Sequence, residues 1–176
     1  MDPDRKDALE MLYTSVDDPR KGLPYELFLF ISSLVPMVNV DLLIIDDRKR
    51  VLLTWRDDEI HGKGWHVPGG MIRYKETAEN RIHATAREEL GAGVAFEPVP
   101  EVEEIIDPER RVRGHHISLV YKCRLISEPA AALQFTGGEP KGGQWAWHQD
   151  CPTNFIDAHK RYGRFFNANE CGQTHI

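Results

Sequence analysis

The stretch that decides the fold runs from Trp65 to Gly91 and reads WHVPGGMIRYKETAENRIHATAREELG. It begins with a turn that contains two adjacent glycines, which allow the backbone to come close to a ligand. Thr77 is expected to cap a helix that ends at Gly91, because threonine favours helix starts and glycine favours helix ends. Apolar side chains at four-residue intervals predict one buried face of this helix: Ala78, Ile82, Ala86 and Leu90.

A second face of the same helix is polar, because residues three and four positions apart project together: Arg81, Thr85, Glu88 and Glu89. This face is either a solvated surface with an incidental pair of glutamates or a ligand-binding surface. The preceding glycine pair favours the ligand, since it can turn a carbonyl toward a metal. Adjacent carboxylates supply the hard oxygen ligands that Mg²⁺ prefers.

Composition limits the classes of protein. The chain has 176 residues, 41% of them hydrophobic, and a formal net charge of −6, which fits one domain and gives no reason to expect a nucleic-acid partner. The longest apolar stretch, residues 27–40, is too short to cross a membrane. Three scattered cysteines argue against a disulfide framework and a zinc site, and the N-terminus lacks a secretion signal, so we expect a cytoplasmic protein.

The order of patterns along the chain predicts its organisation. We expect an N-terminal extension over residues 1–22, a helix over 23–35 that Pro36 ends, one domain over 36–168 and a flexible tail over 169–176. Two aliphatic runs, 38–45 and 51–55, predict a hairpin. Further strands are expected at 94–96, 102–106, 116–125 and 144–148. A final amphipathic helix is expected at 155–166.

Several other side chains have two interpretations. Asp41, inside an apolar run, is more often a hydrogen-bonded scaffold residue than a catalyst. One of the pair His115 and His116 should face inward, because alternate strand residues point to opposite faces. The tryptophans at 65, 145 and 147 favour core packing over base stacking. The basic run at 110–113 favours a solvated hairpin tip over phosphate binding.

The stretch resembles the Nudix hydrolase family, whose signature is G-x5-E-x7-R-E-U-x-E-E-x-G-U, with U an aliphatic residue. The matching residues are Gly70, Glu76, Glu88, Glu89 and Gly91, and the departures are Ala84, Thr85 and Ala92. The resemblance covers residues 36–150 and is greatest with the GDP-mannose mannosyl hydrolase branch, whose signature is also degenerate. It implies an α+β Nudix fold, a mixed β-sheet sandwiched between α-helices (α/β/α).

The resemblance also implies a set of site residues. Mg²⁺, with Mn²⁺ as an alternative, would be held by the Gly69 carbonyl, Glu88 and Glu89. Arg81 would replace the missing arginine, and Glu139 is the candidate base or extra metal ligand in a late loop that lacks the expected histidine. The substrate-binding residues would be Arg56, Arg73, Asp41 and His116.

The expected function is therefore Mg²⁺-dependent hydrolysis of a nucleoside diphosphate derivative, first of all a nucleotide sugar such as GDP-mannose. Two alternatives remain: a conventional nucleoside diphosphatase that cleaves a P–O bond in another substrate, and an inactive Nudix-fold module that binds a nucleotide. Attack at phosphorus or at the anomeric carbon is not decided by the sequence. A homodimer is an open alternative to a monomer.

Overall fold

The computed structural model describes residues 2–59 and 62–166, so the tail expected at 169–176 lies outside the described residues. The α-helices are α1 (Pro3–Thr14), α2 (Tyr25–Ser32) and α3 (Ala78–Thr85), and α3 continues as a π-helical turn, η2 (Ala86–Leu90). Short 3-10 helices are η1 (Pro19–Lys21), η3 (Ala131–Leu133) and η4 (Asp157–Phe165). The final helix expected at 155–166 is therefore present but is wound as a 3-10 helix.

The strands form two sheets. The first has the order β4 (Gly69–Met71), β1 (Met37–Ile44), β7 (His115–Leu125) and β5 (Val94–Phe96), and β6 (Glu101–Ile106) also pairs with β7. Strands β1 and β7 are parallel and the other pairs are antiparallel, so this sheet is mixed. The second sheet has the order β3 (Gly62–His66), β2 (Val51–Asp58) and β8 (Trp145–His148).

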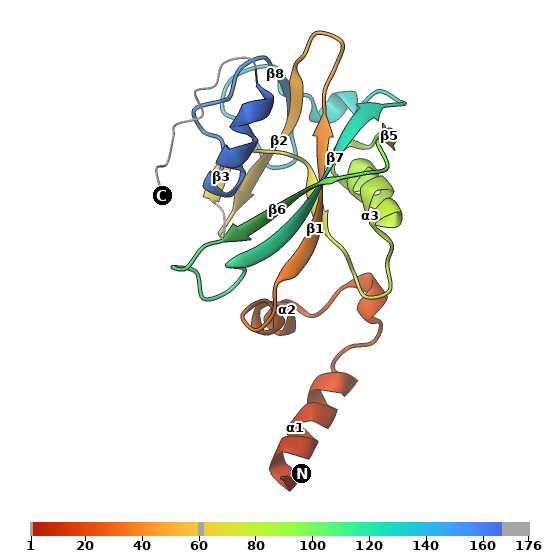
Figure 1. Cartoon of the computed structure of the whole chain (residues 1–176), viewed down its shortest axis with the longest axis vertical. Coiled ribbons are helices and arrows are strands. Elements are labelled where there is room, and N and C mark those ends of the chain that lie inside the picture. Colours follow the sequence, from red (N-terminus) through yellow and green to blue (C-terminus); the bar gives the residue numbers. More distant parts are fainter. Residues whose placement is uncertain (1, 60–61, 167–176) are drawn as a thin grey trace.

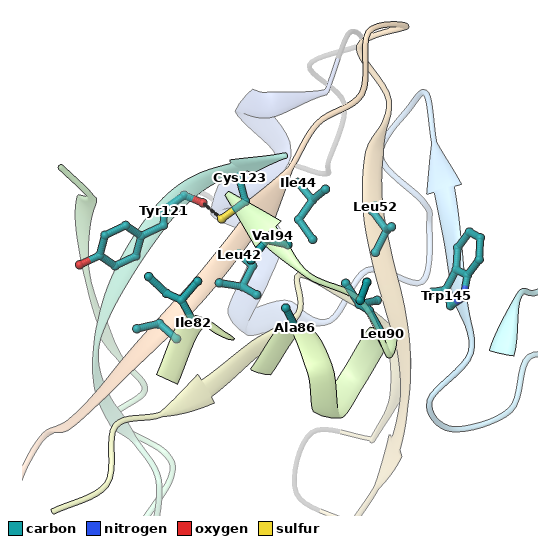
Figure 2. Packing of buried hydrophobic residues seen from close by; sticks show 12 residues of the cluster. Leu42, Ile44, Leu52, Ile82, Ala86, Leu90, Val94, Tyr121, Cys123 and Trp145 are labelled. Carbon is teal, nitrogen blue, oxygen red and sulfur yellow. Dashed lines mark hydrogen bonds between the residues drawn. The ribbon is translucent and has the colours of Figure 1, made fainter. Parts of the chain in front are cut away.

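From Val40 to Ile44, strand β1 is buried on both faces, which explains the apolar run in this part of the strand. Leu42 and Ile44 face a core cluster that includes Ile82, Ala86 and Leu90 of the α3–η2 helix, and Figure 2 shows these side chains converging. Leu43, on the opposite face, belongs to a second cluster with Tyr162 of η4. Helical segments therefore pack on both sides of β1, and the expected fold class is confirmed (Figure 1).

The expected hairpin between residues 38–45 and 51–55 is wrong in its pairing. The two strands are joined only by the bridge between Ile45 and Val51, after which β1 pairs with β4 and β7 while β2 pairs with β3 and β8. The turn between them is closed by Asp46, which accepts hydrogen bonds from the N–H groups of Arg48 and Arg50. The strands therefore separate into different sheets, and this separation positions the site.

The helix predicted after the glycine turn has the expected ends. The Thr77 hydroxyl accepts a hydrogen bond from Asn80 N–H at 3.1 Å, and Gly91 has a φ of 63°. Its last turn differs from the expectation, because Gly91 N–H bonds to Ala86 O, five residues earlier, in a wider π-type turn. The polar face is not simply solvated either, since Arg81 and Thr85 are only 4% and 2% exposed.

The N-terminal helix α1 buries none of its residues and extends away from the rest of the molecule (Figure 1). Within the described residues, no helix is long and apolar enough to cross a membrane. Cys123 is a free buried thiol, whereas Cys151 is disulfide-bonded, so the argument against disulfides does not hold for Cys151. An odd number of cysteines leaves one unpaired but does not prevent a single bridge.

Candidate active site

A cavity of about 90 Å³ lies where β1 and β2 have separated. It is lined by Asp41 of β1, Arg56 of β2 and His116 of β7, and by both glycines of the turn, Gly69 and Gly70. Gly69 is required there by sterics, because a Cβ at this position would clash with Asp41 Oδ1. The glycine pair thus brings β4 against β1 and forms the floor of a cavity that we call the central cavity.

Glu89 reaches the glycine turn from the end of the helix. Its Oε1 accepts a hydrogen bond from Gly69 N–H at 3.1 Å, and its Oε2 accepts one from the Thr54 hydroxyl at 2.8 Å. Burial raises the pKa of Glu89 to about 7, although both hydrogen bonds and the charge of Arg56 act in the opposite direction. A carboxylate with this pKa can exchange a proton for a cation near neutral pH.

Glu88 lies beside Glu89 in a second cavity, of about 250 Å³, which also contains Arg56 and His66. We call it the glutamate cavity. Within the described part of the chain, no group of three or more His, Cys, Asp or Glu side chains is arranged to hold a metal ion. Two carboxylates still fit Mg²⁺, because this ion is usually held by one or two carboxylates together with waters and substrate phosphates. The donor set suits a metal that arrives with a diphosphate.

Arg81 is held in an ion pair with Glu76. Its Nε and Nη2 donate to the two oxygens of Glu76 at 2.9 and 2.8 Å, and its Nη1 lies 3.4 Å from Glu88 Oε2. Burial alone would raise the pKa of Glu76, but the hydrogen bonds from Arg81 and from Arg73 N–H hold it below its ordinary value. Arg81 therefore joins two signature glutamates, while only the backbone of Arg73 is engaged here.

Thr85, which stands at the position of the missing signature glutamate, is packed under Gly70. A Cβ on Gly70 would approach Thr85 Oγ1 to 2.6 Å, so the helix and β4 are in close contact. The Thr85 hydroxyl is buried and has no hydrogen-bond partner among the described residues. No third carboxylate replaces the missing one at this point of the described structure.

Asp41 and His116 both line the central cavity. Asp41 is 3% exposed and accepts a hydrogen bond from the Tyr162 hydroxyl at 2.6 Å, and burial raises its pKa. Burial and the nearby charges of Arg113 and Arg110 lower the pKa of His116 to about 4. His115 points the other way, toward Glu104, as strand alternation predicts.

Arg113 corrects the interpretation of the basic run as a solvated hairpin tip. Its side chain lines the central cavity, whereas Arg111 is exposed and Arg110 pairs with Asp107 at 2.9 Å. The spacing of the run gave no sign of this difference, because a positive φ of 55° at Arg113 redirects the chain.

The structure separates Glu139 from the other predicted residues. Its side chain is 87% exposed and lies 4.0 Å from Lys63 Nζ. Two further imidazoles line the central cavity: His66, which the sequence suggested to be structural, and His159, which sequence reasoning missed. His66 bonds to Thr54, and His159 accepts a hydrogen bond from Val67 N–H at 3.1 Å. Only the apolar pattern of the last helix hinted that His159 faces inward.

Comparisons with known proteins agree with this geometry. The sequence matches the NUDIX domain family over residues 35–163. It is 37% identical over 81 residues to the low-salt glycan biosynthesis protein Agl8 of Haloferax volcanii, covering 46% of this chain and 51% of the relative. It is 30% identical over 112 residues to an ADP-ribose pyrophosphatase of Methanocaldococcus jannaschii, covering 61% and 56% respectively.

The fold is also found in solved structures. A MutT NUDIX hydrolase from Burkholderia pseudomallei aligns with a TM-score of 0.58 at 24% identity, covering 74% of this chain and 97% of that one. The chain therefore belongs to the Nudix hydrolase family, whose members bind small molecules containing a nucleoside diphosphate and generally use divalent metal ions. It spans about half the length of the curated relatives that it matches.

Proposed function

We propose that this protein is a Mg²⁺-dependent hydrolase of a nucleotide sugar. The observation that carries the proposal is the position of Glu89, which is hydrogen-bonded to the Gly69 backbone and lies beside Glu88 at a cavity that Arg56 also lines. This arrangement places carboxylates for a cation and a guanidinium for phosphate oxygens at one cavity. The substrate would therefore be bound through its diphosphate.

The residues have separate tasks in this proposal. Glu88, Glu89 and the Gly69 carbonyl would hold the metal, which would neutralise negative charge on the diphosphate of the substrate. Thr54 and the Gly69 N–H orient Glu89 through the hydrogen bonds already described. Arg56 binds phosphate oxygens, and Arg81 keeps Glu88 and Glu76 in place without entering the central cavity. Asp41 and His116 face the bound substrate in the central cavity.

Two relatives support a nucleotide sugar as the substrate. One is a glycan biosynthesis protein, and the other acts on ADP-ribose, in which a sugar is joined to a nucleoside diphosphate. GDP-mannose is the first compound to test, because the degenerate signature is similar to that of the GDP-mannose mannosyl hydrolases. Mn²⁺ is the second metal to test.

An oxygen-labelling experiment tests the proposal. The protein is incubated with Mg²⁺, labelled water and a panel containing GDP-mannose and ADP-ribose, and the products are identified by mass spectrometry. Label in the free sugar would establish attack at the anomeric carbon, and label in a nucleotide or sugar phosphate would establish attack at phosphorus. Absence of metal-dependent product from the whole panel would refute the proposal.

One observation favours a second candidate, a nucleotide-binding module without catalysis. Thr85 replaces a signature glutamate and its hydroxyl has no hydrogen-bond partner among the described residues, while Glu139 lies in an exposed loop. A module of this kind would bind a nucleotide sugar in calorimetry and release no product. The labelling experiment and calorimetry on the same panel therefore separate the two functions.

A further inference from the structure

Arg113 lines the central cavity and forms no ion pair with the residues that the structure describes. Arg56 lies 3.4 Å from Asp58, and Arg110 lies 2.9 Å from Asp107. Within residues 2–59 and 62–166, Arg113 has no carboxylate within 4.0 Å, and its buried Nε makes no hydrogen bond. A half-buried guanidinium without an ion pair is costly, because charged groups that are removed from water are normally paired.

The chain holds Arg113 in this position from two sides. The loop before it is closed by the hydrogen bond from Asp107 N–H to Gly114 O at 2.7 Å. From α2, the Ser32 hydroxyl accepts a hydrogen bond from Arg113 N–H at 3.2 Å, and Phe28 lies under the guanidinium at 5.5 Å. A long cationic side chain ordinarily reaches solvent, whereas here a helix covers it. Helix α2 precedes residue 35, where the family match begins.

The glutamate cavity, the central cavity and a third cavity share lining residues. Arg56 and His66 line both the glutamate cavity and the central cavity. Arg113 and His116 line both the central cavity and a third cavity of about 260 Å³, which also contains Arg110. The order of the cavities therefore places Arg113 at the end remote from the glutamates. A ligand held at Glu89 can extend past Arg56 to reach it.

The positive charge of Arg113 and of the neighbouring Arg56 favours the binding of an anion between them. Burial and the neighbouring charge of Arg56 lower the pKa of Arg113, and the charge of Asp58 only partly opposes them; the guanidinium remains protonated at neutral pH. Two nearby cations repel one another, and an anion between them removes that repulsion. Guanidinium groups also present parallel N–H donors that match carboxylate and phosphate oxygens.

We propose that Arg113 binds a second anionic group of the substrate, a carboxylate or a phosphate, at the end of the cavities remote from Glu89. The proposal rests on the proposed function and narrows its substrate class to nucleoside diphosphate derivatives with an additional anion. Phe28 and Ser32 are positioning residues, because they hold the arginine and do not supply the charge.

Calorimetry in EDTA on the full-length protein tests the proposal without turnover. The ligands are two base-matched pairs, UDP-glucose with UDP-glucuronate and GDP-mannose with GTP, so the added anion is a carboxylate in one pair and a phosphate in the other. We expect the anionic member of at least one pair to bind about 10-fold more tightly to the wild type, the range of a charged hydrogen bond. Arg113→Gln should abolish this preference.

Matched variants distinguish the effect of the Arg113 charge from an effect on folding. Arg111→Gln, at the exposed neighbouring position, should keep the wild-type preference, and Arg113→Lys should retain part of it. Ser32→Ala and Phe28→Leu should each reduce it by a few-fold, because they loosen the arginine without removing its charge. Circular dichroism of every variant checks that it is folded.

The outcomes distinguish this proposal from the proposed function. Equal affinities within both pairs, a preference that survives Arg113→Gln, or no binding of any ligand would overturn the role of Arg113. Parallel turnover assays with Mg²⁺ report on the hydrolase separately. A binding preference that depends on Arg113, without turnover of any compound, would support the anion site and refute hydrolysis of these ligands. Turnover of a compound, together with equal affinities of wild type and Arg113→Gln, would support the hydrolase and refute the anion site.

Discussion

Two arginines near the Gly69–Gly70 turn differ in their partners: Arg81 is in an ion pair, and Arg113 is not in one with the described residues. Arg81 donates two hydrogen bonds to Glu76 and is 4% exposed. Arg113 lines the central cavity beyond the same turn and leaves its Nε without a partner among the described residues. A satisfied buried ion pair maintains the shape of a site, whereas an unsatisfied buried cation is available to a ligand. The following predictions test this distinction.

The largest effect is expected from breaking the satisfied pair. Arg81→Met leaves the carboxylate of Glu76, only 17% exposed, without its partner, and should lower the free energy of unfolding by about 3–5 kcal/mol. Urea denaturation measures the change. Arg87→Met, at an exposed position close by on the same helix, is the control and should stay within about 0.5 kcal/mol of the wild type. Equal stabilities for the two variants would contradict the scaffold role.

The next effect concerns catalysis rather than stability. Glu89→Gln removes a proposed metal ligand and should lower metal-dependent turnover about 100-fold or more, with a small effect on folding. The control is Glu79→Gln, an exposed glutamate in the first turn of α3, which should behave as the wild type. Steady-state assays over a range of Mg²⁺ concentrations provide the comparison. Unchanged turnover in Glu89→Gln would show that the reaction centre lies elsewhere.

A smaller effect is expected on the free energy of unfolding when the pH is lowered. His116 has a pKa of about 4 in the folded protein against an ordinary value of 6.5, so the unfolded chain binds this proton first as the pH falls. The contribution of neutral His116 to the free energy of unfolding is fully present well above pH 6.5. This free energy should fall by about 2 kcal/mol at pH 5, because the unfolded chain then binds the proton. Denaturation of the wild type and of His116→Gln at pH 8 and pH 5 isolates it. Identical pH dependence in both proteins would exclude this origin.

The smallest effect is expected at Thr85. Its hydroxyl has no hydrogen-bond partner among the described residues, so Thr85→Val should leave stability unchanged or raise it by up to about 1 kcal/mol. Turnover should also be preserved. Thermal unfolding and the labelling assay measure both quantities. A clear loss of turnover at unchanged stability would instead give the hydroxyl a contact with bound substrate or water.

Local patterns were sufficient where one segment decides its own structure. Thr77 and Gly91 mark the helix ends, and the spacing of Ile82, Ala86 and Leu90 identified the buried face. These features depend on helix geometry and on capping, both of which act over a few residues. The alternation of His115 and His116 on one strand was predictable for the same reason.

Patterns failed where distant segments meet. The hairpin was expected because adjacent strands usually pair, but β2 finds its partners in β3 and β8. Arg113 has the same composition around it as the exposed Arg111, and only contacts with α2, about 80 residues earlier in the chain, distinguish the two. His159 likewise reaches the cavity through the packing of η4. Such contacts depend on tertiary packing, which residue spacing alone does not determine.

The separation of β1 and β2 beyond the Ile45–Val51 bridge has a thermodynamic consequence for ligand binding. The turn that joins the strands is closed by the Asp46–Arg50 ion pair at 2.7 Å, and Asp41 and Arg56 line the central cavity from two different hydrogen-bonded sheets. A receptor whose groups are already in place loses little conformational entropy when it is occupied. We therefore expect association without a slow closing step, with single-exponential kinetics whose rate rises linearly with ligand concentration.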